Sequence, residues 1–345
     1  MRIIRYSAFF VLVLVLGCGS SDYDQEILKP QSKKNMGDLL VVLDKQYWNN
    51  SSISYSIKKN FGQLVTTTPL PYEPEYDIEF VDESGVNKII KRHKTILIVD
   101  IDPFFKKNYA FSPNPIFDLW AKNQIVYKIN ASSEKSAVAL INRHADSLKL
   151  GIRQFYHSTI LSTASYEHSS NELIQKNHSI QLCLPSNMNV KKTTTNFTWL
   201  NKTTIKKDAN GDHEIQQGLF IYCYPYTSEN IFSSTKQVIV RDSLLKKFVH
   251  GTTPNSYMVT REDQLAKLVS SSQLVNKQYI FSLKGLWRVE NDKMGGPFSS
   301  ISTVSNEGDK VITIEGYVYA PNFSKRELIR ELEAYMYSFK SSTLN

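Results

Sequence analysis

The spacing of apolar residues changes along the chain between the period of a strand and that of a helix. An apolar run lies between Gly37 and Asp44, as is typical of a strand buried on both faces. Ile53, Ile57 and Phe61 then recur at four-residue spacing, which predicts a helix. Further strands are predicted at about 77–81, 94–101 and 124–129, and a long helix from residue 132 or 133 to about 157. The first half is therefore predicted as β-α-β-β-β-α, with helices covering a sheet.

The second half is predicted as a series of strands with a helix at about 231–248 and a last helix after Ser324. Ser324 and Glu327 fit the S-x-x-E capping box, in which each side chain accepts a hydrogen bond from the other residue's backbone N–H. The strand before them, 310–320, alternates apolar and polar residues, which indicates that the helix covers one sheet face. The predicted fold class is α+β, with two domains that each hold a mainly antiparallel sheet covered by helices.

The N-terminal segment has the pattern of a targeting signal. Arg2 and Arg5 precede an uncharged stretch, 6–17, which is too short to cross a bilayer as a helix and ends at Cys18. This order is typical of a bacterial lipoprotein signal, so we expect cleavage before Cys18 and lipid on its thiol. Leu16 stands where such signals usually have a small residue, and a plain secreted protein is the alternative.

The chain without its signal is too long for one ordinary hydrophobic core, which favours two domains. We expect a signal peptide over 1–17, a polar and acidic tether over 18–35, a first domain over 36–160, a junction over 161–178 and a second domain over 179–345. The expected location is the outer membrane, with the lipid-anchored protein either periplasmic or exposed on the surface.

The charge of the chain limits the classes of partner that it can bind, and its cysteines raise the question of a disulfide. The formal net charge of +8 falls to +6 without the signal, because two of the 41 Lys and Arg residues lie there. The remaining basic runs are short and separated, so we interpret them as solvated faces and expect no nucleic-acid partner. Cys183 and Cys223 both fall in predicted strands in an oxidising compartment. A disulfide between them and two buried free thiols are both compatible with the sequence.

Three long motifs carry a family resemblance, and they lie at 251–260, 285–298 and 314–321. With them the chain resembles the domain-of-unknown-function 4837 family of Bacteroidota lipoproteins, and 38–48, 241–243 and the last helix also fit. The resemblance implies an envelope location and a two-part α+β architecture, without an activity. The strand that ends at Leu184, the hairpin through Trp199 and the last helix are in addition similar to the Mog1/PsbP type of α/β/α sandwich, which would describe the second domain.

Known catalytic and nucleotide-binding motifs are absent from the sequence. It contains no H-E-x-x-H, no zinc-type Cys/His spacing, no P-loop, no G-x-G-x-x-G and no G-x-S-x-G. The trio Asp212, His213 and Glu214 follows an Asn-Gly turn, and we interpret it as a solvated hairpin tip. We therefore expect neither a metal nor a cofactor.

The candidate site lies in the segment around a Gly-Gly pair. Its residues are Trp287, Asp292, Met294, Gly295, Gly296 and Phe298. This segment is either a glycine-hinged loop that presents Asp292 and aromatic rings to a ligand, or a β-turn with Trp287 and Phe298 in the core. Arg241, Asp242 and Glu315 are further charged candidates, which a buried Arg–carboxylate pair would also explain.

Two functions follow from these observations. The first hypothesis is a non-catalytic binding or assembly component of the envelope, with a protein or glycan partner held in a groove along 287–298. The alternative is a hydrolase of cell-wall or surface glycan, which requires Asp292, Glu315 or Asp242 to line one pocket as paired carboxylates. The missing catalytic motifs favour the first hypothesis.

Overall fold

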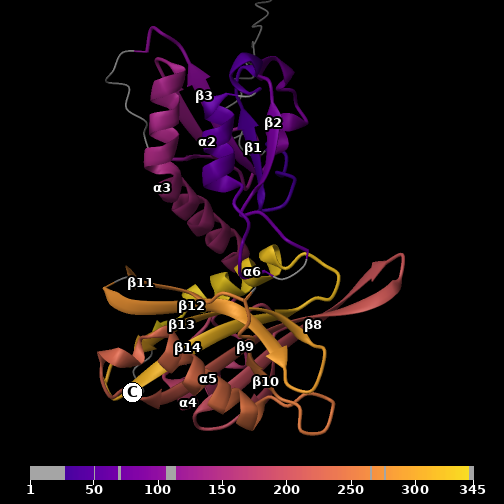
Figure 1. The fold of residues 1–345 in the computed structure, drawn as a ribbon, viewed down its shortest axis with the longest axis vertical. Helices are drawn as coiled ribbons and strands as arrows, with labels where there is room; N and C mark the ends of the chain where they lie inside the picture. Colours follow the sequence, from indigo (N-terminus) through magenta and orange to yellow (C-terminus); the bar gives the residue numbers. More distant parts are fainter. Residues whose placement is uncertain are drawn as a thin grey trace, which may run out of the picture.

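The computed structural model describes residues 28–49, 51–68, 71–105, 114–264, 266–275 and 277–341. The predicted signal, Cys18 and the first part of the predicted tether lie outside the described residues. Within them the chain forms two units, each built on its own sheet (Figure 1). Among the described residues no helix is long and apolar enough to cross a membrane. The α+β class predicted from the sequence is confirmed.

The first unit holds a five-stranded sheet in the order β2-β1-β3-β5-β4. Its strands are β1 (Asp38–Val42), β2 (Asp77–Val81), β3 (Thr95–Ile101), β4 (Ile116–Phe117) and β5 (Ile125–Ala131). β1 runs parallel to both β2 and β3, β3 runs parallel to β5, and β4 alone is antiparallel to its neighbour. The prediction of a mainly antiparallel sheet is therefore wrong for this unit. All five residues of β1 are buried, as expected of a parallel strand covered on both faces.

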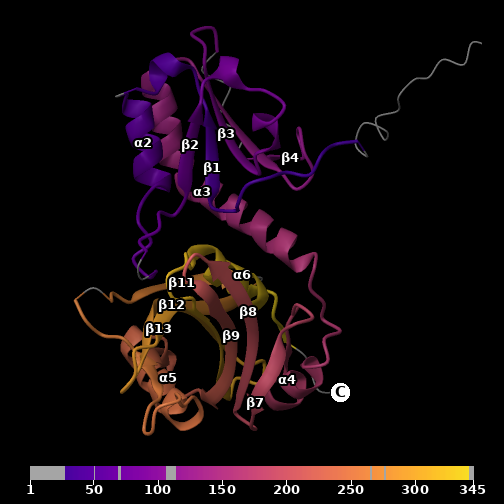
Figure 2. The same cartoon turned by 90° about the vertical axis from the view of Figure 1, so that its right-hand side faces the viewer.

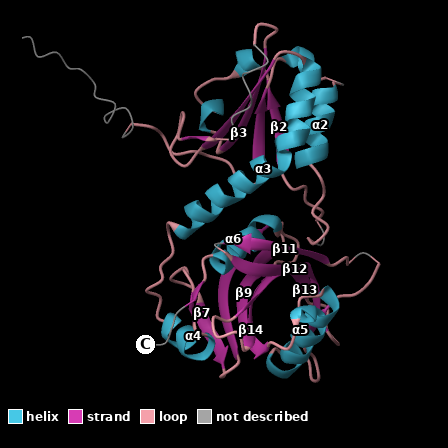
Figure 3. Cartoon of the chain, turned by 90° about the vertical axis from the view of Figure 1, so that its left-hand side faces the viewer, coloured by secondary structure: helices cyan, strands magenta, loops and turns pink. Residues whose placement is uncertain are grey.

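Two helices pack on this sheet and form its larger core, α2 (Ser52–Phe61) and α3 (Glu134–Leu161). Ser133 and Ser136 cap the start of α3 reciprocally. The buried stripe of α3 contains Ala137, Ile141, Ala145, Leu148, Ile152 and Tyr156. With 28 residues, α3 outruns the sheet, and its C-terminal half reaches the second unit (Figure 3). Short 3-10 turns complete the unit at η1 (Lys45–Tyr47), η2 (Glu83–Gly85) and η3 (Ile90–Arg92).

The second unit is a curled antiparallel sheet in the order β10-β12-β13-β14-β9-β8-β7, with β11 also paired to β12 (Figure 2). Its strands are β7 (Asn189–Thr193), β8 (Phe197–Asp208), β9 (Gly211–Pro225), β10 (Met258–Thr260), β11 (Val269–Val275), β12 (Gln278–Val289), β13 (Gly295–Val304) and β14 (Lys310–Tyr319). Here the predicted antiparallel arrangement is confirmed. Asp212 to Glu214 lie in the long β8–β9 hairpin, as interpreted from the sequence.

Helices cover both faces of this sheet. They are α4 (Asn171–His178), η4 (Glu229–Ile231), α5 (Ser234–Phe248) and α6 (Arg326–Tyr337), and β6 (Ile180–Gln181) pairs with β15 (Lys340–Ser341) beside them. α6 packs with Ile312 and Ile314 of β14, whereas α5 packs on the face that holds Tyr317. Gly316 faces α6 so closely that an added Cβ would lie 2.9 Å from Leu332. The alternation of β14 therefore separates the two helices, as its pattern predicts.

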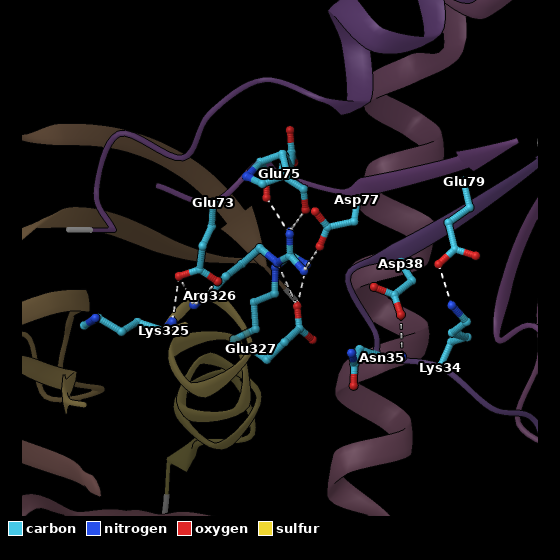
Figure 4. A network of polar contacts seen from close by, with 12 residues as sticks. Lys34, Asn35, Asp38, Glu73, Glu75, Asp77, Glu79, Lys325, Arg326 and Glu327 are labelled. Carbon is cyan, nitrogen blue, oxygen red and sulfur yellow. Dashed lines mark hydrogen bonds and ion pairs between the residues drawn. The ribbon is translucent and has the colours of Figure 1, made fainter. Parts of the chain in front are cut away.

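The N-terminus of α6 joins the two units (Figure 4). Glu73, from the loop before β2, accepts the backbone N–H of Lys325 at 2.6 Å and that of Arg326 at 3.1 Å. Arg326 in turn donates to the carbonyl oxygen of Pro74 and to Asp77. The predicted Ser324–Glu327 capping box is not formed, because Glu73 of the first unit satisfies the free N–H groups of this helix and Glu327 binds Arg326 instead.

Cys183 and Cys223 are both buried free thiols. The disulfide that the sequence left open is therefore not formed. Cys183 follows β6, where its backbone N–H donates to Ser338 Oγ, whereas Cys223 lies near the C-terminal end of β9 with its thiol against His178. The two side chains belong to separate local packing arrangements.

Candidate functional site

The candidate loop is the tight turn between β12 and β13. Asn291 adopts a positive φ of 63°, and Asp292 accepts hydrogen bonds from the Thr253 hydroxyl and from the Lys293 backbone N–H. Trp287 and Phe298, on either side of the turn, are 1% and 0% exposed and belong to one hydrophobic cluster. The packing of these two rings follows the β-turn interpretation of the sequence.

The same turn also borders a concave surface with a volume of about 550 Å³, here called the hairpin pocket. Five of the predicted residues line it, namely Trp287, Asp292, Met294, Gly295 and Gly296. Gly296 is needed for this geometry, because a Cβ there would lie 1.9 Å from the Val318 carbonyl oxygen and 3.1 Å from Trp287 Nε1. The packed turn and the pocket thus coexist, because Trp287 and Phe298 lie in the core while Asp292 lines the concave surface.

Sequence reasoning missed the other walls of the hairpin pocket. Thr66, Thr68 and Tyr72 come from the first unit, and Arg261, Tyr319 and Asn322 come from the second unit but were not among the predicted site residues. Only contact between the two units brings these residues together, so no local signal marks them. Phe298, Arg241, Asp242 and Glu315 are not among the lining residues.

The hairpin pocket combines aromatic, apolar and cationic groups. Tyr72 is 61% exposed. The Nε1–H of Trp287 is buried and has no hydrogen-bond partner among the described residues. Arg261 and Arg288 form surface ion pairs with Asp263 and Glu290, whereas Lys293 makes no ion pair with any described residue. Asp292 is the single carboxylate among the described lining residues.

Arg241 and Glu315 lie away from this pocket and form a buried ion pair between α5 and β14. Arg241 Nε lies 3.0 Å from both carboxylate oxygens of Glu315, and its Nη2 lies 2.8 Å from Oε1. Nη1 donates to Asp242 and Thr260, and the guanidinium carbon lies 4.1 Å from the centre of the Phe298 ring. The pair is 1% and 0% exposed, so no substrate reaches it.

The charges in this pair are matched. Burial on its own would lower the pKa of Arg241, and the carboxylates of Glu315 and Asp242 outweigh that effect and raise the pKa. Burial raises the pKa of Glu315, which the guanidinium opposes, and the three N–H···O contacts hold the pair in its ionised form. Arg241, Asp242 and Glu315 are therefore structural residues, as the ion-pair interpretation of the sequence has it.

A second polar cluster, missed from the sequence, surrounds His178 at the end of α4. Its Nδ1 lies 3.3 Å from Cys223 Sγ and its Nε2 lies 2.8 Å from Thr198 Oγ1. Burial lowers the pKa of His178 to about 4 and raises the pKa of Cys223 to about 12. A catalytic cysteine requires a low thiol pKa, so this Cys–His contact does not form an activated nucleophile. Among the described residues no group of three or more His, Cys, Asp or Glu side chains is placed to hold a metal ion.

Comparison with known sequences now assigns the second unit. Residues 167–338 match the family described as Domain of unknown function (DUF4837). Through this unit, the chain belongs to the DUF4837 family. Residues 32–163, ahead of the DUF4837 region, match Domain of unknown function (DUF8532). No curated protein matches the chain.

Two solved structures show distant likenesses to this chain. A structure of a point mutant of the protein Mog1 is 6% identical, with a TM-score of 0.30 over 48% of this chain and 92% of its own. A protein of Bacteroides thetaiotaomicron is 8% identical, with a TM-score of 0.20 over 50% of this chain and 48% of its own. Because neither TM-score reaches 0.5, neither likeness bears on function.

Proposed function

We propose that this protein is a non-catalytic binding component of the cell envelope, which holds a segment of a partner protein in the hairpin pocket. The observation that carries this proposal is the pocket itself, which both units line and in which Tyr72 is 61% exposed and Lys293 makes no ion pair with any described residue.

The composition of the hairpin pocket favours a protein partner with an acidic side chain. Tyr72, Met294 and Arg261 are of the residue types enriched in the centres of protein interfaces. Lys293 offers an ammonium group that no described residue neutralises. A carboxylate of the partner would neutralise this ammonium group, while apolar atoms of the partner would cover Met294 and Tyr319.

The hydrolase alternative requires two carboxylates across one cleft. Of its three candidates, Asp292 lines the hairpin pocket, whereas Glu315 and Asp242 are bound to Arg241. The described lining residues supply no second carboxylate, so a paired-carboxylate mechanism lacks its partner group. Binding is therefore the better supported function.

The test uses the intact protein in its native cells, with a photo-crosslinking amino acid at position 72. We expect a discrete protein adduct, whose yield falls at least severalfold when Lys293→Glu is added, because the reversed charge repels an acidic partner. Lys236→Glu, an exposed lysine on α5 outside the pocket, is the matched control and should leave the adduct unchanged. Equal adducts in both variants, or a crosslinked glycan in place of a protein, would refute the proposed partner.

The proposed location depends on the lipid at Cys18. Two or more acyl chains anchor a protein stably, since each buried CH₂ contributes about 0.8 kcal/mol. We expect the intact mass of the wild type to carry a diacylglyceryl increment that Cys18→Ala lacks, and the wild type alone to sediment with membranes. Proteolysis of whole cells then separates a surface location from a periplasmic one. A wild type without lipid would contradict the proposed anchor.

A further inference from the structure

A second cavity, of about 290 Å³, lies between the two units and is here called the inter-unit cavity. Its walls come from the loop after α2, from α3, from β12 and β13, and from α6. Binding sites occur preferentially at such junctions, and this volume suits a molecule of monosaccharide size. The loop residue Thr66 lines both this cavity and the hairpin pocket, which otherwise have separate walls.

Three polar side chains line the inter-unit cavity without a hydrogen bond or ion pair to any described residue. Arg153, on α3, makes no hydrogen bond or ion pair with any described residue. Tyr76 is 3% exposed, and its hydroxyl has no hydrogen bond within the described part of the chain. His157 stacks on Tyr337 with ring centres 5.8 Å apart, and neither of its ring nitrogens is hydrogen-bonded to a described residue.

The other cations of the inter-unit cavity are already neutralised. Lys284 lies 2.6 Å from Glu333, which also accepts from Ser299 Oγ. Lys149 faces Glu75 at 3.5 Å and Asp146 at 3.2 Å. Arg326 and Arg330 both contact Glu327. Arg153 therefore carries the uncompensated positive charge among the described residues of this cavity.

Burial fixes the protonation states around Arg153. It raises the pKa of Tyr76 to about 12, against the opposing effect of Arg330 and Arg153, so the phenol stays a donor at neutral pH. Burial also lowers the pKa of His157 to about 4, and the neutral imidazole keeps one donor and one acceptor nitrogen. The cavity thus presents a guanidinium, a phenol and a neutral imidazole.

We propose that the inter-unit cavity is a binding site for a small hydroxylated molecule that bears one carboxylate or phosphate group. The anion lies against the Arg153 guanidinium and the Tyr76 hydroxyl, and a ligand hydroxyl bonds to His157. A guanidinium group binds either a carboxylate or a phosphate through paired N–H groups, so the same site can accept either anion. Because the two units share the walls, the bound molecule would hold them in one arrangement.

Calorimetric titration of the full mature chain tests this proposal with glucuronate, inorganic phosphate and uncharged glucose as probes, all at one ionic strength. We expect glucuronate to bind and glucose not to bind. Loss of one charge-assisted hydrogen-bonding group weakens binding by about tenfold or more, so Arg153→Gln should raise the Kd for glucuronate by that factor. Phosphate binding as tight as that of glucuronate would identify a general oxyanion site, and weaker phosphate binding a carboxylate site.

Matched variants distinguish a loss of glucuronate binding from a loss of folding. Arg143→Gln removes an exposed arginine from the same helix outside the cavity, and it should bind glucuronate like the wild type. Tyr76→Phe keeps the ring beneath Arg330 and should weaken binding severalfold. The proposal is wrong if neither anion binds the wild type, or if Arg153→Gln binds glucuronate as tightly as Arg143→Gln does.

Discussion

Replacing Arg241 by methionine is expected to lower the free energy of unfolding by about 3–5 kcal/mol, the range for removal of one partner of a buried ion pair. The substitution leaves Glu315 fully buried with only the Tyr222 hydroxyl to bond, at 3.3 Å. It also leaves Asp242 without the guanidinium that connects it to the core. Chemical denaturation at pH 7, monitored by tryptophan fluorescence, measures the loss.

The loss of stability should differ between replacement of Arg241 and replacement of Glu315. Glu315→Gln leaves Arg241 with Asp242 and Thr260 as acceptors, so it should cost less than Arg241→Met. The double variant Arg241→Met/Glu315→Leu removes both charges and should recover much of the lost stability, because apolar replacement of a buried pair is often neutral. A double variant as unstable as Arg241→Met would show that the network as a whole, and not the orphaned charge, determines the loss.

A surface pair in the same sheet serves as the control. Arg288 and Glu290 lie 2.6 Å apart with side chains 45% and 35% exposed. Exposed pairs contribute about 0–1 kcal/mol, so Arg288→Met should change the unfolding free energy by no more than that. A loss of similar size at Arg241 and Arg288 would contradict the structural role assigned to the buried pair.

Local patterns in the sequence were sufficient for the type of most elements. The apolar run before Asp44 forms β1, and most of the helix predicted at 231–248 forms as α5 (Ser234–Phe248) despite the three β-branched residues at 238–240. Strand direction in the first unit was not predictable in this way. A continuous run of apolar residues predicts a strand that is covered on both faces. The strand that pairs with it, and the direction of that strand, depend on the crossover connections, and the spacing of apolar residues gives no information about these.

The start of α6 shows the same limit at a single position. Ser324 and Glu327 have the spacing of a capping box, yet Glu73 takes that role from 252 residues before Lys325 in the chain. Of the hairpin pocket, the Gly-Gly segment was visible in the sequence because the two adjacent glycines lie in a short stretch that also contains Trp287 and Asp292. The wall that contains Tyr72 exists only through contact between units. Non-local contacts of this kind leave no period or spacing in the sequence.

Acid should destabilise the protein between pH 6.5 and about 4, through His178. The pKa of this buried histidine falls from 6.5 to about 4 because burial disfavours its charged form, and Lys310 adds to the effect. In this window the unfolded chain binds a proton that the folded chain does not, so the free energy of unfolding decreases as pH falls. At 1.36 kcal/mol per pKa unit, the full contribution is roughly 3 kcal/mol, complete above pH 6.5.

Other groups that titrate in acid contribute equally to the wild type and to a His178 variant. His157, whose pKa is also about 4, contributes a similar slope of unfolding free energy against pH in both proteins. Glu333, with a pKa lowered to about 2, contributes a loss only below about pH 4.5. A difference between the two pH profiles above pH 4.5 therefore reports on His178 itself.

Denaturation midpoints of wild type and His178→Gln between pH 7 and 4.5 isolate this contribution. The variant keeps a side-chain amide near Thr198 and should be less stable at pH 7, but its stability should fall less steeply with acid. His250→Gln, at an exposed site after α5, is the control and should keep the wild-type slope. Parallel pH profiles for wild type and His178→Gln would mean that His178 takes up a proton as readily in the folded protein as in the unfolded chain, and that burial does not hold it neutral.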